Sequence, residues 1–437
     1  MFRVMANAWK MVDLRKKILF TLLIIVVFRI GSVIPVPFLD INALQALMQN
    51  NLNNGNELFS MIDMLSGGAF AQATLLAMGV SPYINSSIII QLLTVAIPPL
   101  ERMAKEGEEG RKKIATITRY VTVVLGLIQG TGYYIYLLNN HITIYRKGSY
   151  AVFSAFVIVL AFTAGTALMM WLGEQINQKG IGNGISILLF TGIVARMPAT
   201  INNLGVYFKN AMNNPNQFGQ YFVYVPLFVL IFLAVIWVIV FMNDAERRIP
   251  IQYAKRVVGR KMYGGQSSHI PIKIALAGVM PIIFASSILQ IPNLINAYVN
   301  PTGFWKKVLD ALSTGGWVYS VVYFLLIILF AYFYVAIQYN PIEMANNLRQ
   351  SNGTIPGIRP GKPTADFISK ILSKITLIGA LFLAVIAILP IVFGALTKMH
   401  NMSLGGTSVI ILVGVALETV KQMESQMMMR HYKGFLD

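Results

Sequence analysis

The residues that could do acid–base, nucleophilic or metal chemistry are few and scattered. Cysteine is absent, which excludes disulfides, thiolate nucleophiles and cysteine-ligated metal sites together. The four histidines fall in predicted loops or in the C-terminal tail, at His141, His269, His400 and His431. No His, Asp or Glu cluster lies in an apolar stretch where it could hold a metal or activate a serine. The sequence therefore favours neither an intramembrane protease nor a metalloenzyme, and it implies no cofactor.

The carboxylates are poorly placed for ion-coupled transport. A proton- or sodium-coupled transporter usually keeps an ionisable residue at mid-membrane. Here the acidic residues are interpreted as lying in loops, in a short re-entrant segment or near span ends, among them Asp40, Glu57, Asp63, Glu101, Glu109, Glu174 and Glu418. A secondary transporter of small solutes is the alternative function, and it would need a coupling charge that the sequence does not offer.

The basic residues are more informative. Lys and Arg number 35 against 17 Asp and Glu, a net charge of +18, and the excess is concentrated in segments such as 243–271 and 339–374. In the first segment, basic residues partly alternate with Ile, Val and Tyr, which indicates a protruding β-hairpin. The second contains the Gly- and Pro-rich turn GTIPGIRPGKPT, which carries Arg359. Such arms favour RNA phosphate or an acidic protein surface, although topology alone also makes cytoplasmic loops basic.

The elements that must position these residues are apolar stretches. The 437 residues are 56% apolar and only 12% charged, whereas soluble domains carry roughly 25% charged residues. Each bilayer crossing needs about 20 apolar residues. Ten candidate spans lie near 18–36, 73–97, 114–138, 150–172, 184–201, 221–242, 272–292, 316–338, 375–396 and 404–420. Lys and Arg gather at the N-terminus and in every second loop, which predicts cytoplasmic termini; the first span lacks a cleavage pattern and is interpreted as retained.

One apolar segment is too short to cross a membrane. Residues 57–76, ELFSMIDMLSGGAFAQATLL, are interrupted by Gly67 and Gly68, which is typical of a re-entrant half-helix. Irregular backbone survives at membrane depth only when it is buried in protein or lines a cavity. An amphipathic helix on the outer surface is the alternative interpretation.

Two candidate spans begin with the same motif. GVSPYINSS starts at Gly79 and GVMPIIFAS starts at Gly278, 199 residues later, so both read G-V-x-P-x-I-x-[SA]-S. Five spans separate the copies, so the second half enters the membrane the opposite way up, as in an inverted-topology repeat. The pathway would then lie between the halves, 1–205 and 206–437. A chance match between apolar segments is the alternative.

Several motifs resemble those of one family. Residues 74–91, TLLAMGVSPYINSSIIIQ, and 171–189, WLGEQINQKGIGNGISILL, resemble the two signature segments of the SecY family, the central subunit of the bacterial protein-conducting channel. The resemblance covers essentially the whole chain through KEGEEGRKK at 105–113, RRIPIQYAKR at 247–256, GIRPG at 357–361 and LGGTS at 404–408. It implies an all-α polytopic membrane protein in which ten spans form a clamshell of two inverted five-helix halves.

Two arginines lie in or near predicted spans. Arg29, in VVFRIGSVIP, is interpreted as snorkelling to the outer interface or contacting backbone carbonyls of a neighbouring helix, rather than acting in a pathway. Arg196, in GIVARMPAT, departs from the family pattern, which has a small or neutral residue there. It is also interpreted as snorkelling, and the departure leaves the local packing open.

The resemblance implies three sets of site residues. A plug at about 57–71 would fill the outer funnel, with Met61, Ile62, Met64, Leu65, Gly67 and Gly68. A pore ring would comprise Ile84, Ile88, Ile185, Leu189, Ile283 and Ile411; such an aliphatic collar lets a peptide slide while excluding water and ions by dewetting. A lateral gate would place Ile88, Gln91 and Thr94 opposite Ile283, Ser287 and Ile291.

The resemblance also implies function and partners. The chain would pass unfolded secretory proteins across the bacterial cytoplasmic membrane and release transmembrane segments laterally into lipid. Its basic arms would bind the ATPase SecA or ribosomal RNA through Arg247, Arg248, Lys255, Arg256 and Arg359. The small membrane subunits SecE and SecG and precursors bearing signal sequences would be further partners. Nothing resembles a P-loop, so the resemblance implies a passive channel that a partner drives, not an enzyme.

Overall fold

The structure is a computed structural model that describes residues 2–53, 63–64, 66–213, 219–253, 256–258, 261–263, 267–299, 303–312, 316–397 and 406–433. The fold is mostly helical. The helices are α1 (Phe2–Lys10), α2 (Val12–Gly31), α3 (Ile41–Asn53), α5 (Ser81–Ala96), α6 (Pro98–Lys105), α7 (Glu108–Asn139), α8 (Ser149–Lys179), α9 (Gly184–Asn213), α11 (Tyr221–Asp244), α12 (Met280–Val299), α13 (Phe304–Ala311), α14 (Trp317–Gln338), α15 (Pro341–Gln350), α16 (Lys362–Thr397) and α17 (Gly406–Lys433). The strands are β1 (Glu246–Tyr253), β2 (Arg256–Val258), β3 (Lys261–Tyr263), β4 (Ser267–Lys273) and β5 (Gly353–Thr354).

The helices make this a multi-pass membrane protein. Among the described residues, six helices are long and apolar enough to cross a membrane, or seven if α5 and α6, which meet at 101°, form one broken span. A helix overlaps each of the ten apolar ranges predicted from the sequence. The helix in the first range, α2, carries the charged residues Arg15, Lys16 and Lys17 in its first turns.

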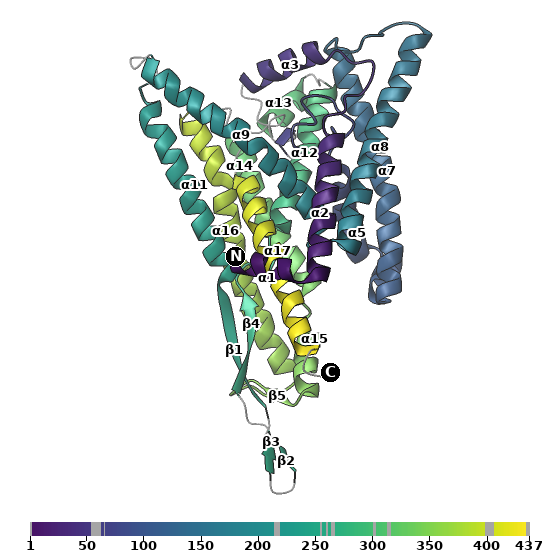
Figure 1. The fold of residues 1–437 in the computed structure, drawn as a ribbon. Helices are drawn as coiled ribbons and strands as arrows, with labels where there is room; N and C mark the ends of the chain where they lie inside the picture. The colour runs from purple at the N-terminus through teal and green to yellow at the C-terminus, as the bar shows by residue number, and fades with distance from the viewer. Residues whose placement is uncertain are drawn as a thin grey trace.

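In the first part of the chain, α5 packs on α7 and α7 packs on α8 (Figure 1). Small residues allow close approach: a side chain at Gly126 of α7 would meet Thr166 of α8 at 3.2 Å. Further along α7, the fully buried Tyr133 stacks on Phe70, with ring centroids 4.5 Å apart. Its hydroxyl donates to the Phe70 carbonyl at 2.8 Å. This bundle therefore supports the segment that contains Phe70.

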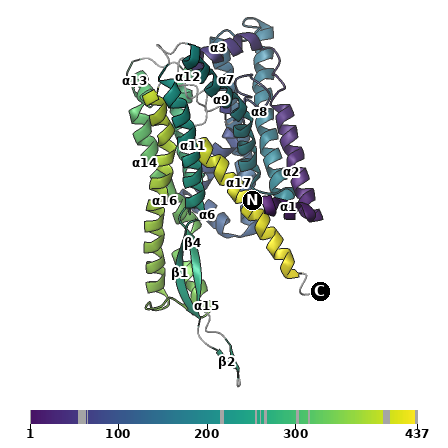
Figure 2. The same ribbon diagram turned by 60° about the vertical axis from the view of Figure 1, so that its left-hand side comes forward.

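In the second part of the chain, α14 packs against both α12 and α16 (Figure 2). Their facing side chains form one apolar cluster that includes Ile282, Ile327 and Ala384. The last helix, α17, contacts α9, α11 and α16, so it joins elements from both parts of the chain.

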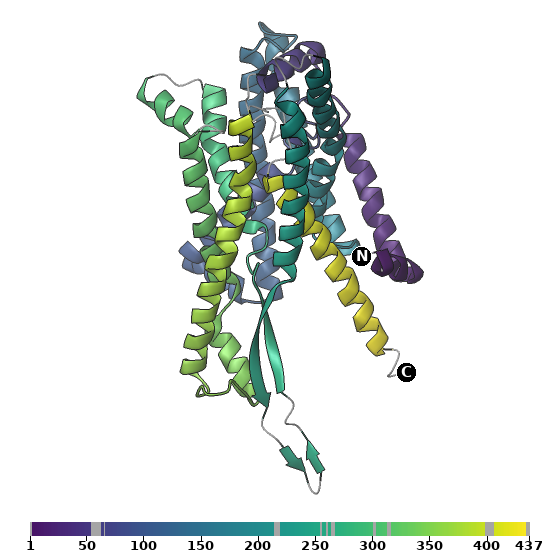
Figure 3. The ribbon, with the colours of Figure 1, turned by 90° about the vertical axis from the view of Figure 1, so that its left-hand side faces the viewer.

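The 243–271 segment forms the predicted hairpin. Strands β1 and β4 pair antiparallel with Ile249 opposite Ile270, and they project from one end of the helices with β2 and β3 beyond them (Figure 3). The other edge of β1 pairs with β5, so the sheet order is β4-β1-β5. Ile251 is buried with Leu348 of α15 and Ile368 of α16. The two basic segments thus form one structural unit anchored on α16.

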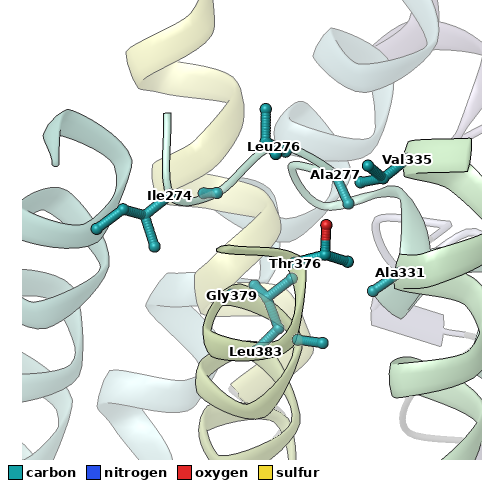
Figure 4. Close-up of a pocket in the computed structure, with 10 residues that line it drawn as sticks. Ile274, Leu276, Ala277, Ala331, Val335, Thr376, Gly379 and Leu383 are labelled. Atoms are coloured by element: carbon teal, nitrogen blue, oxygen red, sulfur yellow. The ribbon is translucent and has the colours of Figure 1, made fainter. Parts of the chain in front are cut away.

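The two repeat copies share a local structure. Gly79 and Gly278 both have φ of 57°, each donates its N–H to the carbonyl three residues earlier, and α5 and α12 each begin two residues later. Just upstream, the carbonyl oxygens of Leu75 and Ile274 lie 1.8 and 2.7 Å from where side chains would start on Gly165 of α8 and Gly379 of α16. Figure 4 shows the surroundings of the second approach, with Ile274 and Gly379 among the residues that line a small pocket.

The half-helix predicted over 57–76 is wrong for residues 66–76. Asp63 and Met64 are helical, but residues 66–80 form successive turns with a single β-bridge between Thr74 and Pro35. The backbone is left-handed at Gly67, Gly68 and Ala73, with φ of 69°, 95° and 42°, which no right-handed helix accommodates. Residues 57–62 and Leu65 lie outside the described residues.

Candidate functional site

One apolar cluster joins α2, α5, α8, α9, α11, α12 and α17. It contains five of the six residues predicted for the pore ring: Ile84, Ile185, Leu189, Ile283 and Ile411. Leu189 and Ile411 are buried, and the other three are half-buried. Aliphatic side chains from both predicted halves thus meet in one place. Ile88, the sixth, is buried instead in the neighbouring cluster around α12, α14 and α16.

The described part of the predicted plug contacts the same cluster. Met64 is 2% exposed and belongs to it, and the Ser408 hydroxyl donates to the Met64 sulfur at 3.5 Å. Gly67 lies against α9, where a side chain on it would meet the Gly192 backbone at 3.1 Å. The predicted plug residues Met61, Ile62 and Leu65 lie outside the described residues.

Asp63 organises the turns of this segment. Its Oδ1 accepts the Ala71 N–H at 2.8 Å, and its carbonyl accepts the Gly68 N–H at 2.8 Å. The same carbonyl accepts the Ser66 hydroxyl at 3.0 Å. Asp63, which was expected in the short re-entrant segment, is 7% exposed.

Two arginines reach this segment from different helices. The Arg196 guanidinium of α9 forms an ion pair with Asp63 Oδ2, so the interpretation of Arg196 as snorkelling is wrong. Arg29 of α2 donates to the Gly67 carbonyl at 3.1 Å. The sequence predicted that Arg29 either snorkels or contacts backbone carbonyls of a neighbouring helix. It does contact a backbone carbonyl, but that carbonyl belongs to the turns around Gly67 rather than to a helix.

The residues predicted for the lateral gate lie on two helices that touch. Helix α5 contacts α12. On α5, Ile88 is buried whereas Gln91 and Thr94 are half-buried. On α12, Ser287 is buried and Ile291 is 48% exposed. Among the predicted gate residues, burial is therefore greatest at Ile88 and Ser287, and exposure is greatest at Ile291. The sixth, Ile283, belongs to the cluster that holds most of the predicted ring. The pairing of individual gate residues stays a prediction.

The predicted docking residues lie on the projecting unit. Arg247 and Arg248 are exposed on β1, where Arg248 pairs with Glu246 at 2.7 Å. Arg359 is exposed at the tip of a turn bounded by Gly357 and Gly361, whose φ values are 81° and 101°. The turn therefore needs both glycines for its backbone conformation. Arg256 lies in β2, and Lys255 lies outside the described residues.

Long-range ion pairs were missed by the sequence reasoning. Arg119 of α7 donates to Glu174 of α8 at 2.7 Å, and Asp63 pairs with Arg196 across 133 positions of the chain. The available signal was a carboxylate and a guanidinium within apolar segments, where an unpaired charge is costly. Among the described residues, no group of three or more His, Asp or Glu is placed to hold a metal.

The comparisons with known proteins bear directly on this arrangement. The family model for SecY matches residues 74–420. The chain belongs to the SecY family. Protein translocase subunit SecY of Streptomyces coelicolor is 44% identical over 459 residues, with all of both chains covered. The protein of the same name from Mycobacterium bovis is 42% identical over 452 residues, again with full coverage of both.

Solved structures show the same fold. This SecY-family chain matches a structure described as a protein conducting channel with a TM-score of 0.65 and 18% identity, covering 94% of this chain and 92% of that one. A structure concerned with the plug domain of the SecY protein matches with a TM-score of 0.64, 17% identity and the same coverages. Sec61 in a canine ribosome-channel complex matches with a TM-score of 0.61, 16% identity and again the same coverages. These relatives favour the channel over the small-solute transporter.

Proposed function

We propose that this chain is the channel-forming subunit of a bacterial protein translocase. The observation that carries the proposal is the aliphatic cluster in which Ile84, Leu189, Ile283 and Ile411 converge with Met64. The full-length relatives named as translocase subunits support the same function. An aliphatic constriction suits a channel whose cargo presents every kind of side chain, because no specific polar contact would serve them all.

The proposed architecture has ten spans in two inverted halves, 1–205 and 206–437. The matching turns at Gly79 and Gly278 support it, as do the equivalent carbonyl approaches to Gly165 and Gly379. In this arrangement α2, α12 and α17 are spans together with α7, α8, α9, α11, α14, α16 and the α5–α6 pair. The aliphatic cluster lies where side chains from both halves meet.

The proposed mechanism has a seal and two exits. At rest, the aliphatic ring excludes water and ions by dewetting, and the plug that contains Met64 covers it. A secretory chain leaves through the ring, whereas a signal sequence or membrane helix leaves sideways between α5 and α12. Lateral release exchanges one apolar contact for another, so gate opening costs little free energy. No covalent step is required of this chain.

The driving force is proposed to come from a partner. The SecA ATPase or the ribosome would bind the unit of β1, β4 and the Arg359 turn, whose exposed arginines fit acidic protein or RNA phosphate. SecE and SecG would brace the helices from the lipid side. Helix α1, the C-terminal end of α17 and the β arm lie toward the same end of the helices (Figures 2 and 3). This placement supports termini on the side of the basic arms, and the bacterial relatives support a bacterial cytoplasmic membrane.

Reconstitution tests the function. The purified chain with SecE and SecG is placed in proteoliposomes and given SecA, ATP and a secretory precursor. Protease protection of the precursor that needs both ATP and a functional signal sequence is the expected result. Uptake of small solutes without precursor protection would overturn the proposal and favour the secondary transporter. A precursor lacking its signal sequence is the matched control.

A further inference from the structure

Two arginines from separate helices contact the 63–71 segment, one at Asp63 and one at Gly67. Arg196 of α9 pairs with Asp63 Oδ2, and Arg29 of α2 donates to the Gly67 carbonyl at 3.1 Å. The segment leaves room for them through its glycines. A side chain on Gly67 would lie 2.9 Å from Arg29 Nη1, and one on Gly68 would lie 3.4 Å from the Arg196 guanidinium.

Asp63 uses its two carboxylate oxygens for different contacts. Oδ1 accepts the Ala71 N–H and thereby closes the turns, while Oδ2 faces Arg196. The local fold of the segment and its attachment to α9 therefore depend on separate oxygens of one side chain. An amide at this position can keep the Oδ1 contact and remove only the charge.

We propose that Asp63, Arg29 and Arg196 form an electrostatic latch that positions the plug in the resting channel. The inference rests on the proposed function and adds to it what holds the plug closed. Arg29 and Arg196 are positioning residues, because they act through the plug rather than on the translocating chain.

The main interaction of the latch is the ion pair between Asp63 and Arg196, which lies in a mostly buried site. The side chain of Asp63 is 10% exposed and that of Arg196 is 30% exposed, so water screens their attraction weakly. Removing one partner of such a pair leaves the other charge uncompensated. Loss of either charge therefore weakens the closed position of the plug, whereas loss of both leaves neither member of this pair uncompensated.

Apolar packing supplies the remainder of the attachment. Met64 is buried in the cluster that contains the predicted ring, and its sulfur accepts from Ser408 of α17. The plug is thus held by packing toward α17 and by charge toward α2 and α9. The latch variants should loosen the plug without unfolding the helices that carry them.

Resting ion conductance in planar bilayers measures the latch. Arg196→Gln and Asp63→Asn should each raise the conductance of the idle channel about tenfold, and Arg29→Gln should raise it less because it loses a single hydrogen bond to a carbonyl. Arg196→Lys should restore most of the seal. The double variant Asp63→Asn with Arg196→Gln should leak no more than either single variant. Arg119→Gln is the matched control, because it breaks an arginine–carboxylate pair between α7 and α8.

A crosslink separates a loosened plug from a damaged fold. The chain has no cysteine, so Met64→Cys with Ser408→Cys introduces one defined thiol pair. A short bifunctional thiol reagent bridges the pair, because a cysteine sulfur lies closer to the backbone than the methionine sulfur that contacts Ser408. Crosslinking in the Arg196→Gln background should return the conductance to the wild-type level. Unchanged conductance of the latch variants, a leak that the completed crosslink does not suppress, or an equal leak from Arg119→Gln would each overturn the latch.

The latch and the proposed function fail in distinguishable ways. If the wild-type chain protects a precursor in proteoliposomes but the latch variants seal normally, only the latch is wrong. If the wild-type chain protects no precursor, the channel function itself is wrong. A second readout is precursor choice: Arg196→Gln should export a precursor with a defective signal sequence several-fold better than wild type, and Arg196→Lys should not.

Discussion

Gly79 and Gly278 lie 199 residues apart and adopt the same left-handed backbone conformation, with φ of 57° at each. The turns before them and the helices after them also correspond. A chance match between two apolar sequences would not reproduce a turn, a helix start and the carbonyl approaches to Gly165 and Gly379. The agreement supports an internal repeat. It also explains why glycine occupies both positions, because the left-handed backbone conformation favours glycine.

The close approach of a carbonyl oxygen to Gly165 and to Gly379 predicts that a side chain at either position lowers the stability of the fold. Gly165→Ala places a methyl group 1.8 Å from the Leu75 carbonyl oxygen, so it must shift backbone and should destabilise by about 3 kcal/mol or more. Gly379→Ala, with its contact at 2.7 Å, should destabilise less. Thermal unfolding in detergent provides the measurement. Gly205→Ala, which meets nothing within 4 Å, should be neutral or stabilising, and an equal loss there would contradict the argument.

The predicted ring is tested by making it polar. Replacing Ile84, Ile283 and Ile411 together with serine should raise ion leak and relax signal-sequence selectivity, because a hydroxyl-lined collar no longer dewets. Conductance in planar bilayers measures the leak. Serine at the buried Ile327, which lies in the neighbouring cluster, is the control for a general loss of packing. A triple variant as tight as wild type would refute the ring assignment.

The docking role of the Arg359 turn is tested by charge reversal. Arg359→Glu should impair SecA-driven transport while the chain still inserts and assembles, because the side chain is exposed and its turn is set by the flanking glycines. Export rate and membrane content are measured in parallel. Lys209→Glu, at an exposed position of α9, should leave export unchanged. Normal export by Arg359→Glu would count against this docking site.

The gate assignment is tested by crosslinking. Thr94→Cys on α5 and Ser287→Cys on α12 should form a disulfide in the resting state if these helices form the gate, and the locked chain should not export. The absence of cysteine in the natural sequence removes competing thiols. Reduction should restore export. Failure to crosslink would question the pairing of these positions, and export through a locked gate would contradict lateral opening.

Much of the fold could be predicted because its causes are local. Apolar length places the helices, and alternation of basic and apolar residues predicts the β1–β4 hairpin, whose Ile249 and Ile251 are buried as that pattern requires. In both cases the pattern within a short segment determines the outcome. The pore ring of Ile84, Ile283 and Ile411 rests on the family resemblance instead, and it stays a prediction.

The turns of the 63–74 segment could not be predicted in the same way. Their conformation depends on Asp63 accepting the Ala71 N–H and on two arginines from distant helices. An arginine in an apolar stretch has the same local pattern whether it reaches lipid headgroups or a buried carboxylate. Only the packing of α2 and α9 around the segment decides between these outcomes.

The central claim is that a polypeptide passes through the aliphatic ring. The most direct test traps a secretory precursor halfway, with one cysteine in its translocating part, in a channel carrying Ile283→Cys. The account predicts a disulfide between the two that needs SecA and ATP, and none with Leu230→Cys, whose side chain is 64% exposed on the outer face of α11. A trapped precursor that crosslinks at Leu230 but not at Ile283 would contradict passage through the ring.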